Sequence, residues 1–540
     1  MKIPSPRFSR LARLLALVAS LALASGCATL RTDVPKQPST SLPPVADTPS
    51  TRYVQEEVAA HRAKSGFRPL ISNTNALMSR VVLADHAEHS IDLQYYIFAN
   101  DSSGRLIAQR LLAAADRGVR VRILLDDLDI DSEDNLLDAL DAHPNIEVRL
   151  FNPFRVRNRS VFSKMGQFLI EGRRLNRRMH NKSFIVDGMQ AIIGGRNIGD
   201  AYFDAGDEVH FRDLDVLVIG PVVPSISSMF DAYWNSDSAF PVTAYEANHS
   251  TPQDLAQQRE ALTRDARAFA ESDYAQALAE DLPNGPSAER QGEWYWGLAT
   301  LVADAPEKAD PEKTDVSKEK KRAQNDRVLL LGPQVQAFLD SASKQALLVS
   351  PYFIPGKTGA DYLIGLAQRG VVIKVLTNSL SATDEPEVHS GYARYRRRLL
   401  EAGVDFFELR PASGQPQQNA YGTSSGVSLH AKTMVVDHRL VYVGSMNLDP
   451  RSQVLNTEMG VIVDCPELAA SIERFFDRAT TPANAFHVVL EPSKNSKTPK
   501  MVWLATDGDK TLRYESDPDV SVVTRMRVSL MSILPIEGLL

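Results

Sequence analysis

The sequence predicts an α/β fold made of two similar domains, an internal duplication in which the two copies face each other. Each copy is expected to be a mixed sheet covered by helices on both faces, with the functional site at the interface. Nearly continuous apolar segments alternate with helical patterns, as in sheets covered on both faces. The same order of segments occurs twice at an offset of about 250 residues. The chain also has 540 residues, more than one hydrophobic core usually holds.

The repeat is clearest in three pairs of expected strands. They are residues 90–98 and 346–354, residues 121–125 and 372–376, and residues 146–151 and 404–409. The first pair carries the similar triplets 95–97 and 352–354, and an Arg-Gly-Val sequence precedes the second pair. Because the strands are apolar throughout and alternate with helical stretches, we expect one covered sheet in each half.

Composition divides the rest of the chain. We expect a signal segment at 1–26, a tether at 27–66, a first domain at 67–245, a connector at 246–325, a second domain at 326–490 and a C-terminal tail at 491–540. Residues 303–322 are charged and nearly free of apolar groups, so this stretch is predicted to be flexible. For Trp294 to Trp296 both an interfacial aromatic patch and ordinary packing stay open.

The N-terminus is typical of an export signal. Basic residues precede an apolar run at 14–24, which is too short for a comfortable membrane span. Leu23-Ala24-Ser25-Gly26-Cys27 resembles the lipobox of bacterial lipoproteins, in which the cysteine is diacylated; an uncleaved N-terminal anchor is the alternative. Residues 31–50 are rich in Pro, Ser and Thr and are predicted to act as a spacer. We therefore expect a protein of the bacterial cell envelope, attached to a membrane through a lipidated Cys27.

Charge and cysteine content narrow the function classes. The net charge of −7 argues against a nucleic-acid partner, since such proteins usually carry a basic excess. The chain has only two cysteines, and if Cys27 carries lipid then Cys465 has no partner for a disulfide. The scattered histidines lack metal-ligand spacing, so neither a metal site nor a cofactor is predicted.

Each half carries one copy of a polar motif with identical spacing. The first copy consists of His180, Lys182, Asp187, Gly194, Gly195 and Asn197, and the second of His430, Lys432, Asp437, Gly444, Ser445 and Asn447. Residues 179–186 and 429–436 have strand-like composition, which would place His and Lys on one face. The aspartates fall at the following turns, where we expect them to brace the turn, and the glycines allow close backbone approach before the asparagine.

Two copies of an imidazole, an ammonium and an amide suit a phosphodiester substrate. The lysines and asparagines would neutralise and orient the nonbridging oxygens. One histidine would attack phosphorus, and the other would protonate the leaving alcohol. The motif alone leaves open which histidine does which.

These residues are the hallmark of the phospholipase D superfamily. Longer stretches such as RRMHNKSFIVDG, GGRNIGDAYF, SLHAKT and GSMNLDPRS resemble bacterial cardiolipin synthases, most closely their C-type branch. The resemblance implies transfer of a phosphatidyl group to phosphatidylglycerol, with phosphatidylethanolamine as one candidate donor. It also implies His180 as the nucleophile, His430 as the acid and then base, and Asp213 and Glu458 as the carboxylates that orient the opposite histidine across the interface.

Two other functions stay open at this point. One is hydrolysis of a phosphodiester by the same kind of site, and the other is a non-catalytic envelope lipoprotein, which the two intact motifs disfavour. Contact with a membrane surface is expected from a basic cluster at 173–178 that immediately precedes His180. The segment 522–540, which mixes arginines with apolar residues, is expected either to lie on the membrane or to dock on the body. The sequence makes no prediction about the oligomeric state.

Overall fold

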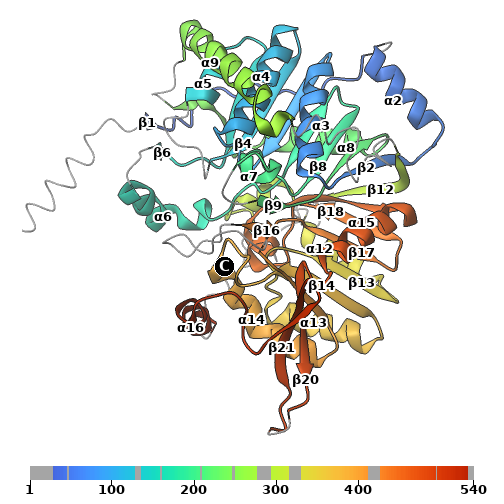
Figure 1. Cartoon of the computed structure of the whole chain (residues 1–540). Helices are drawn as coiled ribbons and strands as arrows, with labels where there is room; N and C mark the ends of the chain where they lie inside the picture. The colour runs from blue at the N-terminus through green and yellow to red at the C-terminus, as the bar shows by residue number, and fades with distance from the viewer. Residues whose placement is uncertain are drawn as a thin grey trace, which may run out of the picture.

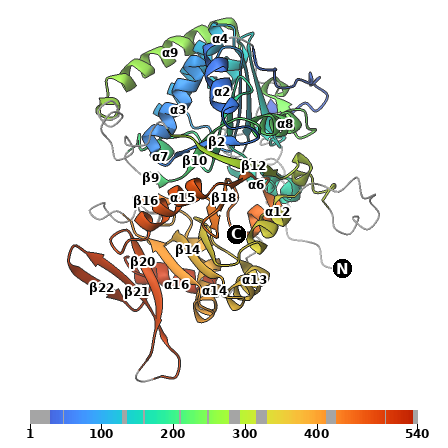
Figure 2. The ribbon, with the colours of Figure 1, turned by 90° about the vertical axis from the view of Figure 1, so that its right-hand side faces the viewer.

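The computed structural model describes residues 28–45, 48–127, 135–157, 161–206, 210–245, 250–276, 293–314, 330–411, 426–493 and 496–532. Two α/β halves are stacked on each other, the N-terminal half above the C-terminal half in Figure 1 and in the perpendicular view of Figure 2. The predicted fold class is confirmed, since each half is a mixed sheet with helices on both sides.

The sheet of the first half has its parallel strands in the middle. Its strands are β2 (Ser65–Leu70), β3 (Ser90–Tyr95), β4 (Arg120–Asp126), β5 (Ile146–Phe151), β7 (Ser183–Val186), β8 (Gln190–Gly194), β10 (Asp215–Ile219) and β11 (Ala239–Pro241). They are ordered β2-β10-β8-β7-β3-β4-β5-β11. Strands β3, β4 and β5 are parallel to one another, and the other neighbours are antiparallel.

The second half repeats this order. Its strands are β12 (Tyr295–Ala303), β13 (Gln345–Val349), β14 (Val372–Asn378), β15 (Asp405–Leu409), β17 (Thr433–Val436), β18 (Leu440–Gly444), β19 (Met459–Asp464), β20 (Ala485–Glu491), β21 (Lys500–Asp507) and β22 (Lys510–Tyr514). They are ordered β12-β19-β18-β17-β13-β14-β15-β20-β21-β22, again with three parallel strands, β13 to β15, in the middle. The two halves are therefore copies of one topology.

Helices cover both sheets. In the first half they are α3 (Asn73–His86), α4 (Ser102–Asp116), α5 (Asn135–Asp141), α7 (Asp200–Phe203), α8 (Val223–Trp234) and α9 (Pro252–Ala270), and in the second α12 (Leu331–Asp340), α13 (Gly356–Gln368), α14 (Pro386–Glu401) and α15 (Pro466–Ala479). One core lies between the first sheet and α3, α4 and α5, and another between the second sheet and α12, α13 and α14. A third core joins the inner faces of both sheets with α8 and α15, so the interface between the halves is itself a hydrophobic core.

Strand β12 belongs to both sheets. Its first residues, Tyr295 to Gly297, pair with β2, and the rest, from Leu298, pairs with β19. Just upstream, Trp294 donates a hydrogen bond to Tyr53 of α2 (Pro49–Ala59), and within β12 the ring of Trp296 stacks on His61 at 4.0 Å between ring centroids. These contacts lie in the stretch that we expected to be a connector, which thus contributes an ordered strand.

Part of the charged stretch is also built into the body. Asp304 and Lys308 are buried, and their side chains form an ion pair of 2.8 Å. The predicted flexibility is therefore wrong for residues 303–309. Composition alone could not show this, because a stretch that is polar on average can still hold one paired and buried charge of each sign.

The expected spacer is not a free linker either. Its residues 31–45 lie along the first half, where the backbone N–H of Ser41 donates to Asp231 at 2.8 Å. The buried guanidiniums of Arg122 and Arg149 donate to the carbonyls of Ser39 and Gln37. An extended, proline-containing segment leaves its carbonyls unpaired, and these arginines bind them. The spacer prediction is corrected for these residues, whereas Cys27 lies outside the described part of the chain.

Two short elements and two further helices complete the body. They are β1 (Ala28–Thr29), which pairs with β6 (Val156–Arg157), and the helices α6 (Val161–Leu175) and α16 (Val522–Met531). In the part of the chain that the structure describes, none of the helices has the length and apolar content needed to cross a bilayer.

Candidate active site

The two motif segments leave their own sheets and pair with the opposite half. The backbone N–H of His180 donates to the carbonyl of Thr457 at 2.9 Å, and that of His430 donates to the carbonyl of Arg212 at 2.8 Å. Around His430, the short strands β9 (His210–Arg212) and β16 (Val427–Leu429) run parallel across the interface. The expected strands are therefore corrected, because β7 begins only at Ser183 and β17 at Thr433, after His and Lys of each motif.

Each histidine meets a carboxylate of the other half. Nδ1 of His180 lies 2.9 and 3.0 Å from the two carboxylate oxygens of Glu458. Nδ1 of His430 lies 2.6 Å from Oδ2 of Asp213. All four side chains are buried. A carboxylate on Nδ1 fixes the tautomer with the proton on Nδ1 and leaves the lone pair of Nε2 free.

Both lysines lie beside their own histidine. Nζ of Lys182 donates to the backbone carbonyl of His180 at 2.7 Å, and Nζ of Lys432 donates to the carbonyl of His430. Burial lowers the pKa of Lys182 to about 7 and that of Lys432 to about 8, although Glu458 and Asp213 oppose the shift. Each site therefore holds a lysine that would keep its proton more firmly once an anion is bound, because the anion raises its pKa.

The two halves form one electrostatic unit. Burial, together with Lys182 and Lys432, lowers the pKa of His180 well below its ordinary value. Burial also lowers the pKa of His430 to about 3, and Lys432 and Lys182 add to the effect while Asp213 opposes it. Each histidine is therefore within electrostatic range of the lysines of both halves.

The two carboxylates differ in their surroundings. Burial raises the pKa of Glu458 to about 7, even though Lys182 and two serine hydroxyls oppose the shift. For Asp213 burial acts in the same direction, but His430, Lys432 and Arg196 outweigh it and hold the pKa below its usual range. Asp213 is thus the firmly ionised member, and Glu458 the one that can take a proton near neutral pH.

Serine and glycine at one motif position explain part of this difference. Oγ of Ser445 donates to one oxygen of Glu458 at 2.5 Å, and Oγ of Ser452 donates to the other at 2.7 Å. The first half has Gly195 in place of Ser445, and a Cβ there would lie 2.3 Å from Oδ1 of Asp213. The shorter aspartate therefore needs a glycine beside it, whereas the longer glutamate is held by two hydroxyls.

The preceding glycines mark equally close backbone contacts. A Cβ at Gly194 would lie 2.6 Å from Cα of Asp215, and one at Gly444 would lie 2.3 Å from the carbonyl of Met459. Gly194 also has a φ of 158°, near extended backbone. Both positions lie where β8 and β18 turn toward the interface, so any larger residue would push the strand ends apart.

The two motif asparagines are bonded differently. Asn197 accepts from the backbone N–H of Ile97 at 3.2 Å and donates from Nδ2 to the hydroxyl of Tyr202 at 2.8 Å. The ring of Tyr202 packs edge-on against His430, with 5.2 Å between centroids. Oδ1 of Asn447 is buried and has no hydrogen-bond partner among the described residues. The second asparagine is therefore the freer of the two to bind a substrate.

The motif aspartates contact backbone, away from the imidazoles. Asp187 accepts from the N–H groups of residues 88, 89 and 90 at 2.8 to 3.3 Å, and Asp437 accepts from those of residues 343, 344 and 345 at 2.7 to 2.9 Å. Both aspartates have a φ of 52°, as the turn after the strand requires. Ser90 thus corresponds to Gln345, which shifts the sequence match of residues 95–97 with 352–354 by two positions.

Sequence reasoning missed the groups that hold the residue before each histidine. Oδ2 of Asp126 accepts from the N–H of Met179 at 2.8 Å. In the other half, Asn378 accepts from the N–H of Leu429 at 2.8 Å and donates to its carbonyl at 3.0 Å. Asp126 and Asn378 end the equivalent strands β4 and β14. A polar residue at the carboxyl end of an apolar parallel strand was the signal that could have found them.

A buried ion pair behind Glu458 was missed as well. Oδ2 of Asp304 accepts from the N–H of Glu458 at 2.9 Å, and Lys308 bonds both Asp304 and the carbonyl of Ser452 at 2.8 Å. Burial raises the pKa of Asp304 to about 6, with Lys308 opposing. The pair thus fixes the backbone on either side of the carboxylate that faces His180.

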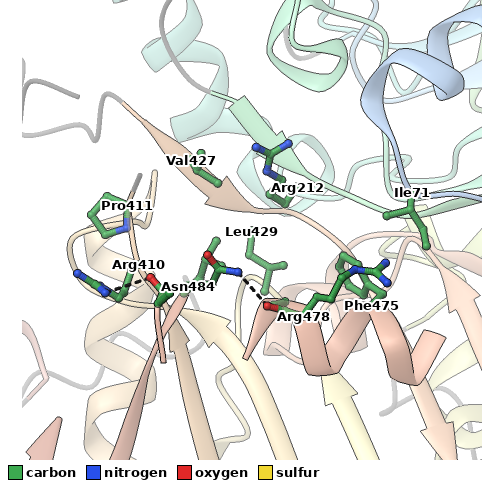
Figure 3. Close-up of a pocket in the computed structure, with 12 residues that line it drawn as sticks. Ile71, Arg212, Arg410, Pro411, Val427, Leu429, Phe475, Arg478 and Asn484 are labelled. Carbon is green, nitrogen blue, oxygen red and sulfur yellow. Dashed lines mark hydrogen bonds between the residues drawn. The ribbon is translucent and has the colours of Figure 1, made fainter. Parts of the chain in front are cut away.

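A cavity of about 520 Å³ adjoins the site where the halves meet beside β9 and β16 (Figure 3). Apolar side chains and arginines from both halves surround it. They include Ile71, Leu429, Phe475, Arg212, Arg410 and Arg478. Arg212 and Leu429 directly precede Asp213 and His430 in the chain, so the cavity wall is continuous with one half of the candidate site.

Comparison with known proteins decides the family. Residues 81–234 and 335–480 match the family model described as "Cardiolipin synthase, PLD-like domain". The chain belongs to this cardiolipin synthase family. It is 39% identical to cardiolipin synthase C of Escherichia coli (strain K12) over 491 residues, which cover 89% of this chain and 97% of that protein. It is also 34% identical to an uncharacterized protein of Helicobacter pylori (strain J99), over 85% of this chain and 87% of that protein.

A solved structure shares the fold of this cardiolipin synthase family member. Phosphatidylserine synthase from Haemophilus influenzae Rd KW20 superposes with a TM-score of 0.51 at 12% sequence identity. The superposition covers 91% of this chain and 100% of that one. At this identity the likeness concerns the fold, which agrees with the duplicated sheet order described above.

The basic cluster before His180 mostly binds other groups of the protein. Arg178 is buried and pairs with Asp126, Arg177 donates to the carbonyl of Lys308, and Arg174 donates to the carbonyl of Pro153. Arg173 is exposed. The expectation that the whole cluster meets lipid is therefore corrected, and one arginine of the four is left facing solvent.

Proposed function

We propose that this chain makes cardiolipin by transferring a phosphatidyl group to a hydroxyl of phosphatidylglycerol through a phosphohistidine intermediate. The observation that carries the proposal is the reciprocal pairing across the interface, His180 with Glu458 and His430 with Asp213. Two oriented imidazoles with two ammoniums within electrostatic range of them suit a phosphodiester. The 39% identity to a cardiolipin synthase supports the same reaction.

His180 acts as the nucleophile in this proposal. Its lowered pKa keeps the imidazole neutral, and the bond from Nδ1 to Glu458 directs the lone pair of Nε2 outward. Attack by Nε2 forms a P–N bond while the P–O bond to the leaving alcohol breaks. Lys182 and Lys432 hold the nonbridging oxygens and balance the charge that develops on them.

His430 carries the proton. The leaving alcohol needs a proton as its P–O bond breaks, and the firmly ionised Asp213 at 2.6 Å supports an imidazolium at His430. In the free protein burial keeps His430 neutral, but the negative charge of a bound phosphodiester raises its pKa toward protonation. Glu458, whose pKa lies near 7, supports a charged partner less well. This difference favours His180 as the nucleophile and His430 as the acid.

The second half of the reaction reverses the proton transfer. The acceptor hydroxyl of phosphatidylglycerol gives its proton to His430 and attacks phosphorus, so the P–N bond breaks and cardiolipin is released. Water in the same place would give phosphatidic acid. The rings of Tyr96, Tyr202 and Phe211 pack against the two imidazoles within 5.2 Å between centroids, which limits the access of water.

The proposed chemistry uses lysine and asparagine in place of a metal ion. The ammoniums of Lys182 and Lys432 supply the positive charge that a divalent ion would otherwise bring to the phosphodiester. Treatment with EDTA is therefore expected to leave the rate unchanged. A loss that zinc or magnesium restores would overturn this part of the proposal.

We also propose attachment to a membrane of the bacterial cell envelope through a lipid on Cys27. The lipobox-like sequence supports it, and Cys27 directly precedes β1. Mass analysis of the N-terminal peptide should find a diacyl group on Cys27 and none in Cys27→Ser. An unmodified peptide from the wild-type chain would contradict the proposal.

One assay tests the reaction. Purified protein is incubated with phosphatidylglycerol, with and without phosphatidylethanolamine, and the lipid products are read by mass. Cardiolipin should form, with glycerol or ethanolamine as the released alcohol according to the donor. His180→Asn serves as the inactive control. Products limited to phosphatidic acid would favour a hydrolase in place of the transferase.

A further inference from the structure

The most exposed apolar side chains of the molecule gather on two helices. Among the described residues, the six most exposed large apolar side chains all lie on α6 or α16. They are Leu169 at 84%, Ile170 at 85%, Val522 at 63%, Val523 at 76%, Met526 at 68% and Leu530 at 66%. Single exposed apolar residues are ordinary, but two groups of neighbouring exposed apolar side chains indicate a surface that binds a partner.

Both helices lie on the same side of the molecule. In Figure 1, α6 and α16 project at the left, opposite β12, one from each half. Strand β1 also lies on this side, and Ala28 pairs with Arg157 just before α6 begins.

Each helix is fixed to the body by its other face. Arg527 of α16 forms an ion pair with Glu387 of α14, and Val528 is buried. In α6, Phe168 packs on Phe154 at 5.7 Å between ring centroids. The apolar residues are thus held in place on ordered helices, and do not belong to loose ends of the chain.

Basic groups stand beside the apolar ones. The exposed Arg173 lies three residues after Ile170, and Arg525 and Arg527 border the exposed apolar residues of α16 on either side, Arg527 being paired with Glu387. Apolar side chains with arginines at their border suit the interface of a bilayer that contains anionic lipid, where the apolar groups enter the acyl region and the guanidiniums meet phosphates.

Helix α6 is also connected to the candidate site. Its Arg174 bonds Asn152 and the carbonyl of Pro153, and the guanidinium of Arg178 lies 5.8 Å from the ring of Phe154. Arg178 in turn pairs with Asp126, which holds the N–H of Met179. The surface that would meet a bilayer is therefore linked to the residue before His180 through a chain of contacts that runs by Arg178 and Asp126.

We propose that α6 and α16 form a membrane-docking surface whose partner is a phospholipid bilayer containing anionic lipid. The surface inserts Leu169 and Ile170 from one half and the apolar face of α16 from the other, so that the site faces the bilayer. The inference rests on the proposed function for its biological sense, since the substrates would come from that bilayer. Insertion itself can be measured without turnover.

An environment-sensitive label tests insertion. The dye NBD is attached to Leu169→Cys in the full chain with Cys27→Ser, since Cys465 is 1% exposed and should not react. Vesicles of phosphatidylcholine with phosphatidylglycerol should shift the emission of NBD to the blue, and vesicles of phosphatidylcholine alone should do so less. Leu298→Cys on β12, also an exposed leucine at 56%, is the matched control and should not change.

Replacing the exposed apolar side chains of α6 by carboxylates tests whether vesicle binding depends on them. Leu169→Asp with Ile170→Asp should weaken vesicle binding about a hundredfold, since each buried aliphatic side chain accounts for about tenfold. Val82→Asp, at an exposed apolar position of α3, is the control. Cardiolipin formation from vesicles should fall in parallel, whereas turnover of a short-chain phosphatidylglycerol in solution should not.

The outcomes separate the two proposals. If the NBD emission at residue 169 does not shift to the blue on vesicles, the docking surface is overturned, whether or not cardiolipin is made. An equal loss of turnover with vesicle and short-chain substrates also overturns it, because α6 would then act on the site itself. Insertion at residue 169 without any cardiolipin formation by the wild-type chain would leave the surface standing and overturn the proposed reaction.

Discussion

Nδ1 of His180 lies 2.9 Å from a carboxylate oxygen of Glu458, although 278 residues separate them in the chain. The equivalent bond of His430 to Asp213 spans 217 residues in the opposite direction. Neither half can therefore orient its own histidine, and the site exists only when the two halves are assembled.

Replacing either carboxylate by its amide should leave the fold intact and impair turnover. In Glu458→Gln and Asp213→Asn the amide can present its N–H to Nδ1, which favours the wrong tautomer and withdraws support from an imidazolium. A loss of about 10³ to 10⁴ in kcat is expected by analogy with other histidine and carboxylate pairs. The losses are measured from initial rates of cardiolipin formation, with circular dichroism as the folding control. A loss below about tenfold, small against the effect of such pairs, would show that the carboxylate only fills space.

The His180 and His430 variants should differ in whether a phosphorylated intermediate accumulates. His180→Ala should abolish all turnover because no P–N bond can form. His430→Ala should still attack a p-nitrophenyl phosphodiester, whose leaving group needs no proton, while release is slowed about 10² to 10⁴ by the missing base. Acid-labile phosphorylated protein should therefore accumulate in His430→Ala and be absent in His180→Ala. Label on His430 in the His180→Ala variant would reverse the two roles.

The pH dependence should reflect the lysines. Burial lowers the pKa of Lys182 to about 7 and that of Lys432 to about 8 in the free protein. Since the charged ammonium binds the phosphodiester, kcat/KM should fall as pH rises through this range. The lowered pKa of His180 keeps it neutral on the acid side, so the nucleophile itself imposes no loss near neutral pH. Lys182, which has the lower pKa of the two, should set the start of the falling limb, so Lys182→Arg should move the limb to higher pH because a guanidinium keeps its proton. An unchanged limb in that variant would exclude Lys182 as its source.

The buried pair behind Glu458 should matter for stability. Lys308→Met leaves Asp304 buried without its partner, which typically costs about 3 to 5 kcal/mol in the free energy of unfolding. The pKa of Asp304 is already raised to about 6 and should rise further. A raised folded-state pKa contributes stability at low pH that is lost as pH rises through it, so the deficit of Lys308→Met should shrink as pH falls from the variant's higher pKa toward about 6 and stay constant below it. Denaturant unfolding at several pH values measures it.

A matched lysine provides the control for this measurement. The side chain of Lys313 is 43% exposed and lies 3.3 Å from Asp237. Lys313→Met should change the free energy of unfolding by less than about 0.5 kcal/mol, as most exposed pairs do. Equal effects at Lys308 and Lys313 would contradict the role given to the buried pair.

The sequence predicted the fold class and the two motifs because both leave a repeated pattern. The period of the apolar segments and the spacing of the motif residues after His180 and His430 can be read from the sequence without any knowledge of tertiary contacts. The partners Asp213 and Glu458 are single acids in the sequence, and only the resemblance to a family suggested them. Their catalytic roles stay predictions, although the structure places them on the histidines.

What sequence reasoning missed depends on contacts between distant segments. The motif residues looked like the start of β7 and β17, but their backbone pairs with Thr457 and Arg212 of the other half. Asp304 and Lys308 lay in a stretch whose average composition indicated flexibility. The proline-rich residues 31–45 indicated a spacer. That prediction was wrong because their hydrogen-bond partners are arginines far along the chain, which local composition does not show.

Strand β12 has a mechanical consequence. Because Trp296 pairs with β2 and Leu298 with β19, one uninterrupted ladder of hydrogen bonds runs from the first sheet into the second. The two halves cannot separate without breaking these hydrogen bonds and exposing the apolar core that they share. On the proposed function, a lipid substrate would then have to reach the site without any separation of the two halves.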